Sequence, residues 1–292
     1  MPTRRWAALA VTVLITSMIT VNPATAQADA PRPVRAVKRL LRAKHGVRVV
    51  ETTRYFLDEW SKTFGNGVRI RGVLQLGPSG PVAVRFTWWD LPRKADSTAA
   101  KPDAHRVIRL GKDVYVGRDQ YPGPVPAGKK WIRFPKNHLG AMNRDMAQDA
   151  GLQPINVYDP SMLTAVLKRS TSTRVSGGFL YRGTMSYREL SKISKNAIVS
   201  WTTGRPIGKK SKGTIAWRLW TDRTGLPTRL ITTDTAGEGK KALVKRSDTR
   251  YTGWGFHLVV TAPPADEVID EADLLAYVRR QNEPIPPDDK NT

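Results

Sequence analysis

The strongest constraint on the fold is a series of short segments in which apolar and polar residues alternate, bounded by Gly, Pro or Asp. The pattern is clear in residues 68–76 and 82–89, which a turn-forming Gly-Pro-Ser-Gly sequence separates. Because no long helix intervenes as a crossover, these segments predict an antiparallel meander. Further predicted strands lie at residues 107–110, 114–116, 174–185, 214–220, 228–233, 243–251 and 256–260.

Four segments have helical periodicity instead, at residues 33–45, 161–168, 187–194 and 267–278. Asp159 and Pro160 suit the N-cap and the first helical position of the second segment. Ser186 and Glu189 have the spacing of a capping box at the start of the third segment. Strands and helices in this order predict an α+β fold.

The first thirty residues have the three-part layout of a secretory signal peptide. Two arginines precede an apolar run at residues 7–21, which is too short to span a membrane. Ala24 and Ala26 occupy the small-x-small positions of a cleavage site, so we expect removal of residues 1–26. A cut after Ala30 is the second choice, and an uncleaved anchor is the alternative that the Pro and Ala cluster argues against.

No internal repeat and no long linker divides the rest of the chain. We therefore expect one domain over residues 27–280. Residues 281–292 are rich in Pro and Asp, which predicts a disordered tail.

The charge of the chain bears on its partners. Lys and Arg number 48 against 25 Asp and Glu, a formal net charge of +23, and removal of the leader with its two arginines changes this to +21. A field of this sign attracts nucleic acid, anionic lipid head groups and anionic wall polymers alike. Because the leader takes the protein away from the chromosome, we expect an anionic membrane or cell-wall polymer rather than nucleic acid.

Two basic stretches are candidates for contact with such a surface. One is the polar side of the predicted helix at 33–45, and the other is the lysine-rich segment at 208–212. The alternative is that both are solvated faces without a partner. The candidate residues are Arg35, Lys38, Arg39, Arg42, Lys44, Lys209, Lys210 and Lys212.

The sequence contains no motif for catalysis or metal binding. The absence of Cys excludes disulfides, thiolate zinc sites, a cysteine nucleophile and a lipidated N-terminal cysteine. The four His form no pair at metal-ligand spacing, and the acidic residues at 266–273 suit the start of a helix. We therefore predict no cofactor, no metal and no enzyme activity. An envelope hydrolase whose residues converge only in the fold is a third hypothesis.

Three segments of the second half carry a resemblance to a known family. Residues 178–185 read GFLYRGTM, residues 217–229 read WRLWTDRTGLPTR, and residues 251–264 begin YTGWG and end TAPP. This order resembles actinobacterial secreted and lipid-anchored proteins of the LolA/LppX-like lipoprotein-carrier fold. In that family a W-x-D-x-x-G-L-P-x-R hairpin precedes a Y-x-x-G ending with a Pro pair. The resemblance covers most of residues 33–270.

The resemblance implies a strongly curved antiparallel β half-barrel wrapped over a few α-helices, with an apolar cavity between them. Members with known roles carry lipids or lipidated proteins across the envelope. This chain lacks the lipobox cysteine of many relatives, so we expect a secreted protein that is not lipid-anchored. The candidates to line the cavity are Met162, Leu163, Val166, Leu167, Trp217 and Leu219, and the alternative is that they pack on one another as core.

Two hypotheses of function follow. The leading one is an exported, non-enzymatic protein that binds an acyl or other apolar ligand, with basic residues engaging anionic head groups. The alternative is an adhesion module that uses its charge to hold anionic wall polymer or a membrane surface and has no ligand cavity.

Overall fold

The computed structural model describes residues 32–56, 66–91, 103–135, 151–193, 198, 200–237 and 242–282. The predicted signal peptide lies outside the described residues, as does the tail beyond Asn282. Among the described residues, no helix is both long enough and apolar enough to cross a membrane.

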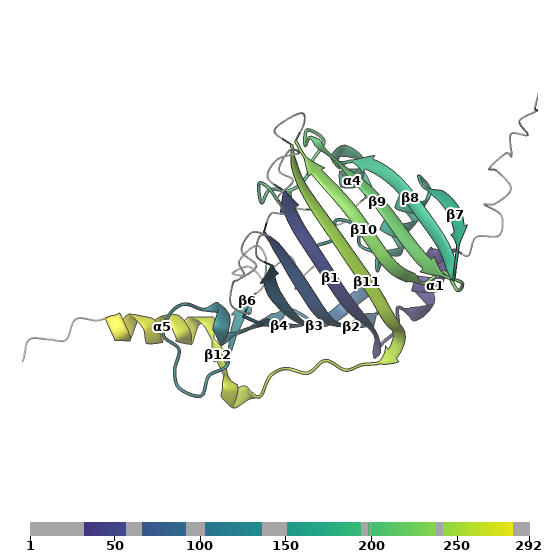
Figure 1. Cartoon of the computed structure of the whole chain (residues 1–292). Helices are drawn as coiled ribbons and strands as arrows, with labels where there is room; N and C mark the ends of the chain where they lie inside the picture. The colour runs from purple at the N-terminus through teal and green to yellow at the C-terminus, as the bar shows by residue number, and fades with distance from the viewer. Residues whose placement is uncertain are drawn as a thin grey trace, which may run out of the picture.

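Twelve strands form one open sheet in the order β12-β6-β5-β4-β3-β2-β1-β11-β10-β9-β8-β7 (Figure 1). Neighbouring strands pair antiparallel, apart from β12 and β6, which pair parallel. The predicted antiparallel sheet is thereby confirmed, and Figure 1 shows that the sheet is twisted and not closed. The strands are β1 (His45–Phe56), β2 (Gly67–Gly77), β3 (Gly80–Leu91), β4 (His105–Leu110), β5 (Asp113–Gly117), β6 (Trp131–Pro135), β7 (Thr171–Val175), β8 (Gly178–Ser186), β9 (Gly213–Asp222), β10 (Pro227–Ala236), β11 (Leu243–His257) and β12 (Val268–Asp270).

The described helices are α1 (Pro33–Leu40), α3 (Pro160–Leu167), α4 (Tyr187–Ile193) and α5 (Glu271–Asn282). Asp159 caps α3 as predicted, because its carboxylate accepts a hydrogen bond from the Ser161 N–H at 2.8 Å. The predicted capping box is also present before α4. Glu189 Oε2 accepts hydrogen bonds from the N–H and the hydroxyl of Ser186 at 2.8 and 2.9 Å.

The sheet has an inner face that carries the core and an outer face on the other side. Side chains of α1, α3 and α4 join one core cluster with inner-face residues of β1 to β3 and β8 to β11. Helix α5 instead packs at the far end of the sheet, where Leu274 contacts Ile132 and Ile269. The main core cluster therefore occupies the inner side of the sheet, and the helices that the structure describes leave most of the outer face uncovered.

Several predicted elements have different bounds in the structure. The helix at 33–45 ends at Leu40, and Lys44 adopts a positive φ of 62° before β1 begins. The strand at 174–185 is two strands, β7 and β8, because Gly177 at φ 82° forms a turn between them.

The third difference concerns the acidic segment predicted as the start of a helix at 267–278. Ala265–Glu267 forms a 3₁₀ turn, and the next three residues form β12. Val268 and Ile269 pair there with Trp131 and Ile132 of β6, so α5 begins only at Glu271.

Candidate functional site

Arginines recur on the outer face of the sheet. In β1 to β4 and β8 to β11 the side chains that alternate with core residues point outward, and many of these are Arg rather than Lys. A planar guanidinium binds phosphate and carboxylate groups with two parallel hydrogen bonds, which an ammonium cannot do. The outward arginines are Arg48, Arg54, Arg69, Arg71, Arg85, Arg106, Arg182, Arg218, Arg229, Arg246 and Arg250.

Four of these arginines lie on four consecutive strands. The register pairs Arg48 of β1 with Val73 of β2, and Val73 in turn with Arg85 of β3. The next row in the same direction contains Arg71 of β2 and Arg106 of β4. Since neighbouring strands are about 4.8 Å apart, one positive charge is available at each strand across this part of the sheet.

A C-terminal arm, defined as residues 258–264, lies against this part of the outer face. The Leu258 N–H donates to the Lys44 carbonyl at 2.9 Å, and the Val260 N–H donates to Gln75 Oε1 at 2.8 Å. Leu258 and Val260 are buried against outward side chains of β3 to β5 such as Ile108. Figure 1 shows the arm leading from the end of β11 past the ends of β1 to β4 to β12.

The arm and the four arginines enclose a groove of about 630 Å³, which we call the arginine groove. It lies between the outer face of β1 to β4 and the end of the arm at Pro263 and Pro264. Its main lining side chains are Arg48, Arg71, Arg85, Arg106, Trp131 and Pro263.

Two of the groove arginines are held against aromatic rings. Arg48 Cζ lies 4.1 Å from the centroid of the Phe256 ring, and Arg106 Cζ lies 4.7 Å from that of Trp131. Stacking fixes the plane of a guanidinium while its N–H edges stay available to a ligand.

None of the four groove arginines has a carboxylate partner among the described residues. Elsewhere on the outer face, by contrast, Arg229 is paired with Asp248 at 2.5 Å and Arg133 with Asp270 at 2.6 Å. Outward arginines thus differ in their pairing, and the four groove arginines are among those without a carboxylate in the described part of the chain.

A second outer-face pocket of about 660 Å³ lies over β8 to β11. Its lining includes four arginines, Arg169, Arg182, Arg218 and Arg246. Of these, Arg169 has a carboxylate neighbour, with its Nη1 3.6 Å from Glu189 Oε1. The positive outer face thus extends well beyond the arginine groove.

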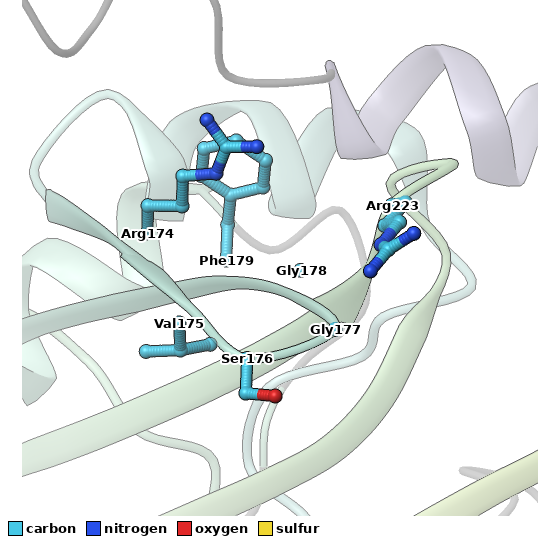
Figure 2. Close-up of a pocket in the computed structure, with 7 residues that line it drawn as sticks. All are labelled: Arg174, Val175, Ser176, Gly177, Gly178, Phe179 and Arg223. Atoms are coloured by element: carbon cyan, nitrogen blue, oxygen red, sulfur yellow. The ribbon is translucent and has the colours of Figure 1, made fainter.

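A third pocket, of about 570 Å³, lies at the turn between β7 and β8. Figure 2 shows Arg174 on one side of it and Arg223, from the turn between β9 and β10, on the other, with Gly177 and Gly178 between them. Both guanidinium groups lack a carboxylate partner among the described residues.

The inner face carries a buried polar cluster instead of an open site. Glu51 Oε1 accepts the Leu152 N–H at 2.8 Å, and Glu51 Oε2 accepts the Thr249 hydroxyl at 2.7 Å. Burial raises the pKa of the Glu51 carboxyl, and the two hydrogen bonds and the charge of Lys245 only partly offset this. The Lys245 ammonium lies 3.6 Å from Asp234, whose carboxylate also accepts the hydroxyl of Tyr187.

This cluster fastens the chain segment at 151–153 to the sheet. Lys245 Nζ donates to the Leu152 carbonyl at 3.2 Å, and Gln153 Nε2 donates to Thr249 Oγ1 at 2.8 Å. Glu51, Asp234 and Lys245 are all at most 7% exposed. We therefore assign these groups a structural role.

The predicted cavity-lining residues belong to the main core cluster. Met162, Leu163, Val166, Trp217 and Leu219 are buried there, and Leu167 is partly buried against it. Only Trp217 borders one of the pockets described above, the one over β8 to β11. These positions agree with the alternative that the six residues pack on one another.

The predicted surface-contact residues are exposed but are not all brought together. Arg35, Lys38, Arg39, Arg42 and Lys44 lie on or just after α1, where Leu40 is next to Gly255 near the C-terminal end of β11. Lys209, Lys210 and Lys212 precede β9 and lie near the opposite end of β11, because the Lys212 carbonyl accepts the Gly237 N–H. The two basic stretches therefore form separate patches.

Sequence reasoning missed the arginine groove, although it contained one signal for it. Arg69 and Arg71 occupy the polar positions of a predicted strand, and Arg85 does the same in the next. No group of three or more His, Asp or Glu in the described part of the chain is arranged to hold a metal ion.

This chain has low similarity to known proteins. No protein-family model matches the chain, and no curated protein does. The complex of MucA and MucB from Pseudomonas aeruginosa matches at 17% identity and a TM-score of 0.28, over 80% of this chain and 59% of that chain. This chain thus spans less than two thirds of that chain.

Two further structures match more weakly. The S-type phycobiliprotein lyase CPES from Guillardia theta has 8% identity and a TM-score of 0.21, over 75% of this chain and 90% of that chain. A β-barrel-like protein of the DUF1849 domain from Brucella abortus has 10% identity and a TM-score of 0.18, over 73% and 100%.

Proposed function

We propose that this protein is an exported, non-enzymatic binding protein that holds a linear anionic polymer of the cell envelope in the arginine groove. The observation that carries the proposal is the set of four arginines on consecutive strands, which line a groove and have no carboxylate partner among the described residues. This is the adhesion hypothesis from the sequence, with its site moved from the two lysine-containing stretches to the outer face.

The shape of the site favours a polymer chain over a flat membrane. A groove of about 630 Å³ bounded by the arm admits a single chain, whereas a bilayer reaches only the outermost side-chain tips. Because the arginines recur at every strand, a polymer with repeated phosphate or carboxylate groups can engage several of them together. A single small anion would use only one or two.

The acyl-ligand hypothesis is a second candidate, favoured by one observation on the inner face. Tyr158 Oη and the indole nitrogens of Trp88 and Trp217 are buried and have no hydrogen-bond partner among the described residues. A polar head group or water next to them would satisfy these atoms. Mass spectrometry of organic extracts of the purified protein tests this candidate, which predicts a co-purifying lipid.

Two variants that each remove four positive charges test the proposed function. The groove variant carries Arg48→Gln, Arg71→Gln, Arg85→Gln and Arg106→Gln, and the α1 variant carries Arg35→Gln, Lys38→Gln, Arg39→Gln and Arg42→Gln. Binding of fluorescent poly(glycerol phosphate) is measured by anisotropy at physiological salt. We expect the groove variant to lose at least about tenfold in affinity and the α1 variant to lose less than about twofold.

The outcomes separate the alternatives. Equal losses of affinity in both variants would mean that binding depends on net charge alone. A larger loss in the α1 variant would mean that the polymer binds at the basic stretch of residues 33–45 that the sequence predicted. Vesicles of phosphatidylglycerol serve as the flat anionic surface, and binding to them as tightly as to the polymer would contradict the polymer assignment.

A further inference from the structure

The strand β7 forms one edge of the sheet. It pairs with β8 on one side, and it is the last strand in the sheet order. The two-residue turn at Ser176 and Gly177 makes Val175 and Gly178 a hydrogen-bonded pair, so by alternation Ser172 and Arg174 direct their N–H and C=O groups to the open side. Such an edge is a template for a further strand.

The end of this edge leads into the pocket between Arg174 and Arg223. Figure 2 shows the two guanidinium groups on either side of the glycine turn. Figures 1 and 2 both place α1 beside this end of the sheet, and its exposed Arg35, Lys38 and Arg39 add positive charge there. An extended chain on β7 that carries carboxylates at this end would meet opposite charge.

Charge complementarity also argues against a second copy of this protein as the occupant. Pairing two β7 edges would bring together two copies of a chain whose formal net charge is +23. An acidic partner has no such penalty.

We propose that the β7 edge binds an extended acidic segment of another protein by antiparallel strand addition, with carboxylates of that segment bound by Arg174 and Arg223. Main-chain hydrogen bonds to Ser172 and Arg174 supply sequence-independent affinity, and the two guanidinium groups supply the preference for acid. In the antiparallel orientation the N-terminal end of the bound segment lies at the pocket, because β7 runs toward it. This site is separate from the arginine groove, and the proposal does not depend on the proposed function.

The probe is a synthetic peptide, N-acetyl-Glu-Glu-Thr-Val-Thr-Val-Thr-amide, tested on the full mature chain. A matched peptide with Lys in place of both Glu reports the charge requirement. Affinity is measured by fluorescence anisotropy, and amide hydrogen exchange of residues 171–175 is followed with and without peptide. We expect slower exchange in β7, and binding of the Glu peptide at least about tenfold tighter than that of the Lys peptide.

Three variants separate strand addition from general attraction. Arg223→Glu should weaken binding of the Glu peptide about tenfold, whereas Arg279→Glu, an equal charge change on exposed α5, should change it less than about twofold. Ser172→Pro removes an outward N–H without changing charge, and edge strands tolerate such a proline. It should weaken binding of the Glu peptide about tenfold while the thermal midpoint stays near that of the parent.

The proposal would be overturned by unchanged exchange in β7, by equal losses in the Arg223 and Arg279 variants, or by full binding to the Ser172→Pro variant. A dimer in light scattering that Ser172→Pro dissociates would assign the edge to a second copy and would also overturn it. Polymer binding in the arginine groove is measured independently, so either result leaves that test intact.

Discussion

The carboxylate of Glu51 on β1 accepts a hydrogen bond at 2.8 Å from the backbone N–H of Leu152, which lies 101 residues later in the chain. The same carboxylate accepts the hydroxyl of Thr249 from β11 at 2.7 Å. One buried acid therefore joins two central strands to the segment that covers them. Because burial disfavours the charged form of this acid, its protonation should affect the stability of the fold.

Glu51→Gln should change how stability depends on pH. Burial raises the pKa of Glu51 above its ordinary 4.5, so the folded protein binds this proton more tightly than the unfolded chain. The stabilisation from this group is full below about pH 4.5 and is lost as the pH rises through the folded pKa. We expect the parent's free energy of unfolding, relative to that of Glu51→Gln, to fall over that window and then level off. Urea unfolding at a series of pH values measures it.

Glu189→Gln is the control with the opposite sign. Hydrogen bonds from the backbone and the hydroxyl of Ser186 lower the pKa of Glu189, so its stabilisation is present above about pH 4.5 and is lost on acidification. If the free energy of unfolding depended on pH in the same way for the parent and for Glu51→Gln, then Glu51 would have the same pKa in the folded and unfolded states, which would contradict the prediction.

Lys245→Met should destabilise the protein strongly. The ammonium lies 3.6 Å from Asp234 and donates to the Leu152 carbonyl, and its removal leaves a buried carboxylate without its countercharge. Breaking a buried pair in this way costs about 3–5 kcal/mol in the free energy of unfolding, measured by urea denaturation.

The double variant Asp234→Asn with Lys245→Met is the matched comparison. It removes both charges, so it should recover a substantial part of the loss, and a double-mutant cycle gives the coupling energy. Additive losses would mean that the two groups do not stabilise each other.

The same buried polar groups explain why the sequence predicted some strands and missed β1. In β2 and β3 the inward residues are apolar, so alternation indicates the strand directly. In β1 the inward positions after Val49 are Glu51 and Thr53, which breaks the alternation. Their burial depends on Thr249 and Ser247 of β11, partners that no local pattern contains.

The arginine groove was beyond sequence reasoning for a related reason. Arg71 and Arg85 each appear as the polar side of a strand, but only the register shows that they share one surface with Arg48 and Arg106. The arm was predicted in part as a strand at 256–260, whereas β11 ends at His257 and the chain then crosses the outer face. The helix caps were predictable because their partners are only two or three residues apart.

The salt dependence of polymer binding should report the number of groove contacts. Each arginine that neutralises a charge of the polymer releases a counterion, so log K falls with log salt concentration in proportion to the contacts made. Arg85→Gln should reduce that slope by about one, as should Arg71→Gln. Arg279→Gln on α5 is the control and should leave the slope unchanged. Titrations at four salt concentrations measure it, and equal slopes for all three variants would contradict binding in the groove.

Phe256→Leu should weaken polymer binding without any change of charge. The Phe256 ring lies 4.1 Å from Arg48 Cζ and fixes that guanidinium in the groove. An exposed cation–π contact contributes about 0.5–1 kcal/mol, so we expect a two- to fivefold loss of affinity for poly(glycerol phosphate).

Phe56→Leu is the control for loss of a ring. The centroid of the Phe56 ring lies 5.1 Å from Arg246 Cζ, on the part of the outer face beyond the groove. Phe56→Leu should leave the affinity within about twofold of the parent. Thermal unfolding of both variants separates an effect on the arginine from loss of packing. Equal affinities for the two variants would mean that Arg48 needs no fixed orientation.

The arm can be tested through a residue that contacts no ligand in the proposal. Gln75 on β2 accepts the Val260 N–H at 2.8 Å and so holds the arm on the outer face. Gln75→Leu removes the acceptor and leaves a donor unsatisfied, a change of about 1–3 kcal/mol that loosens the arm. We expect faster amide exchange at residues 258–264 and a loss of polymer affinity of at least about threefold, because one wall of the groove is no longer fixed. Gln75→Glu keeps an acceptor in place and should hold the arm as the parent does. If the arm loosened in the Leu variant while polymer affinity stayed unchanged, the groove would not need its wall, and binding would depend on the arginines of the open sheet alone.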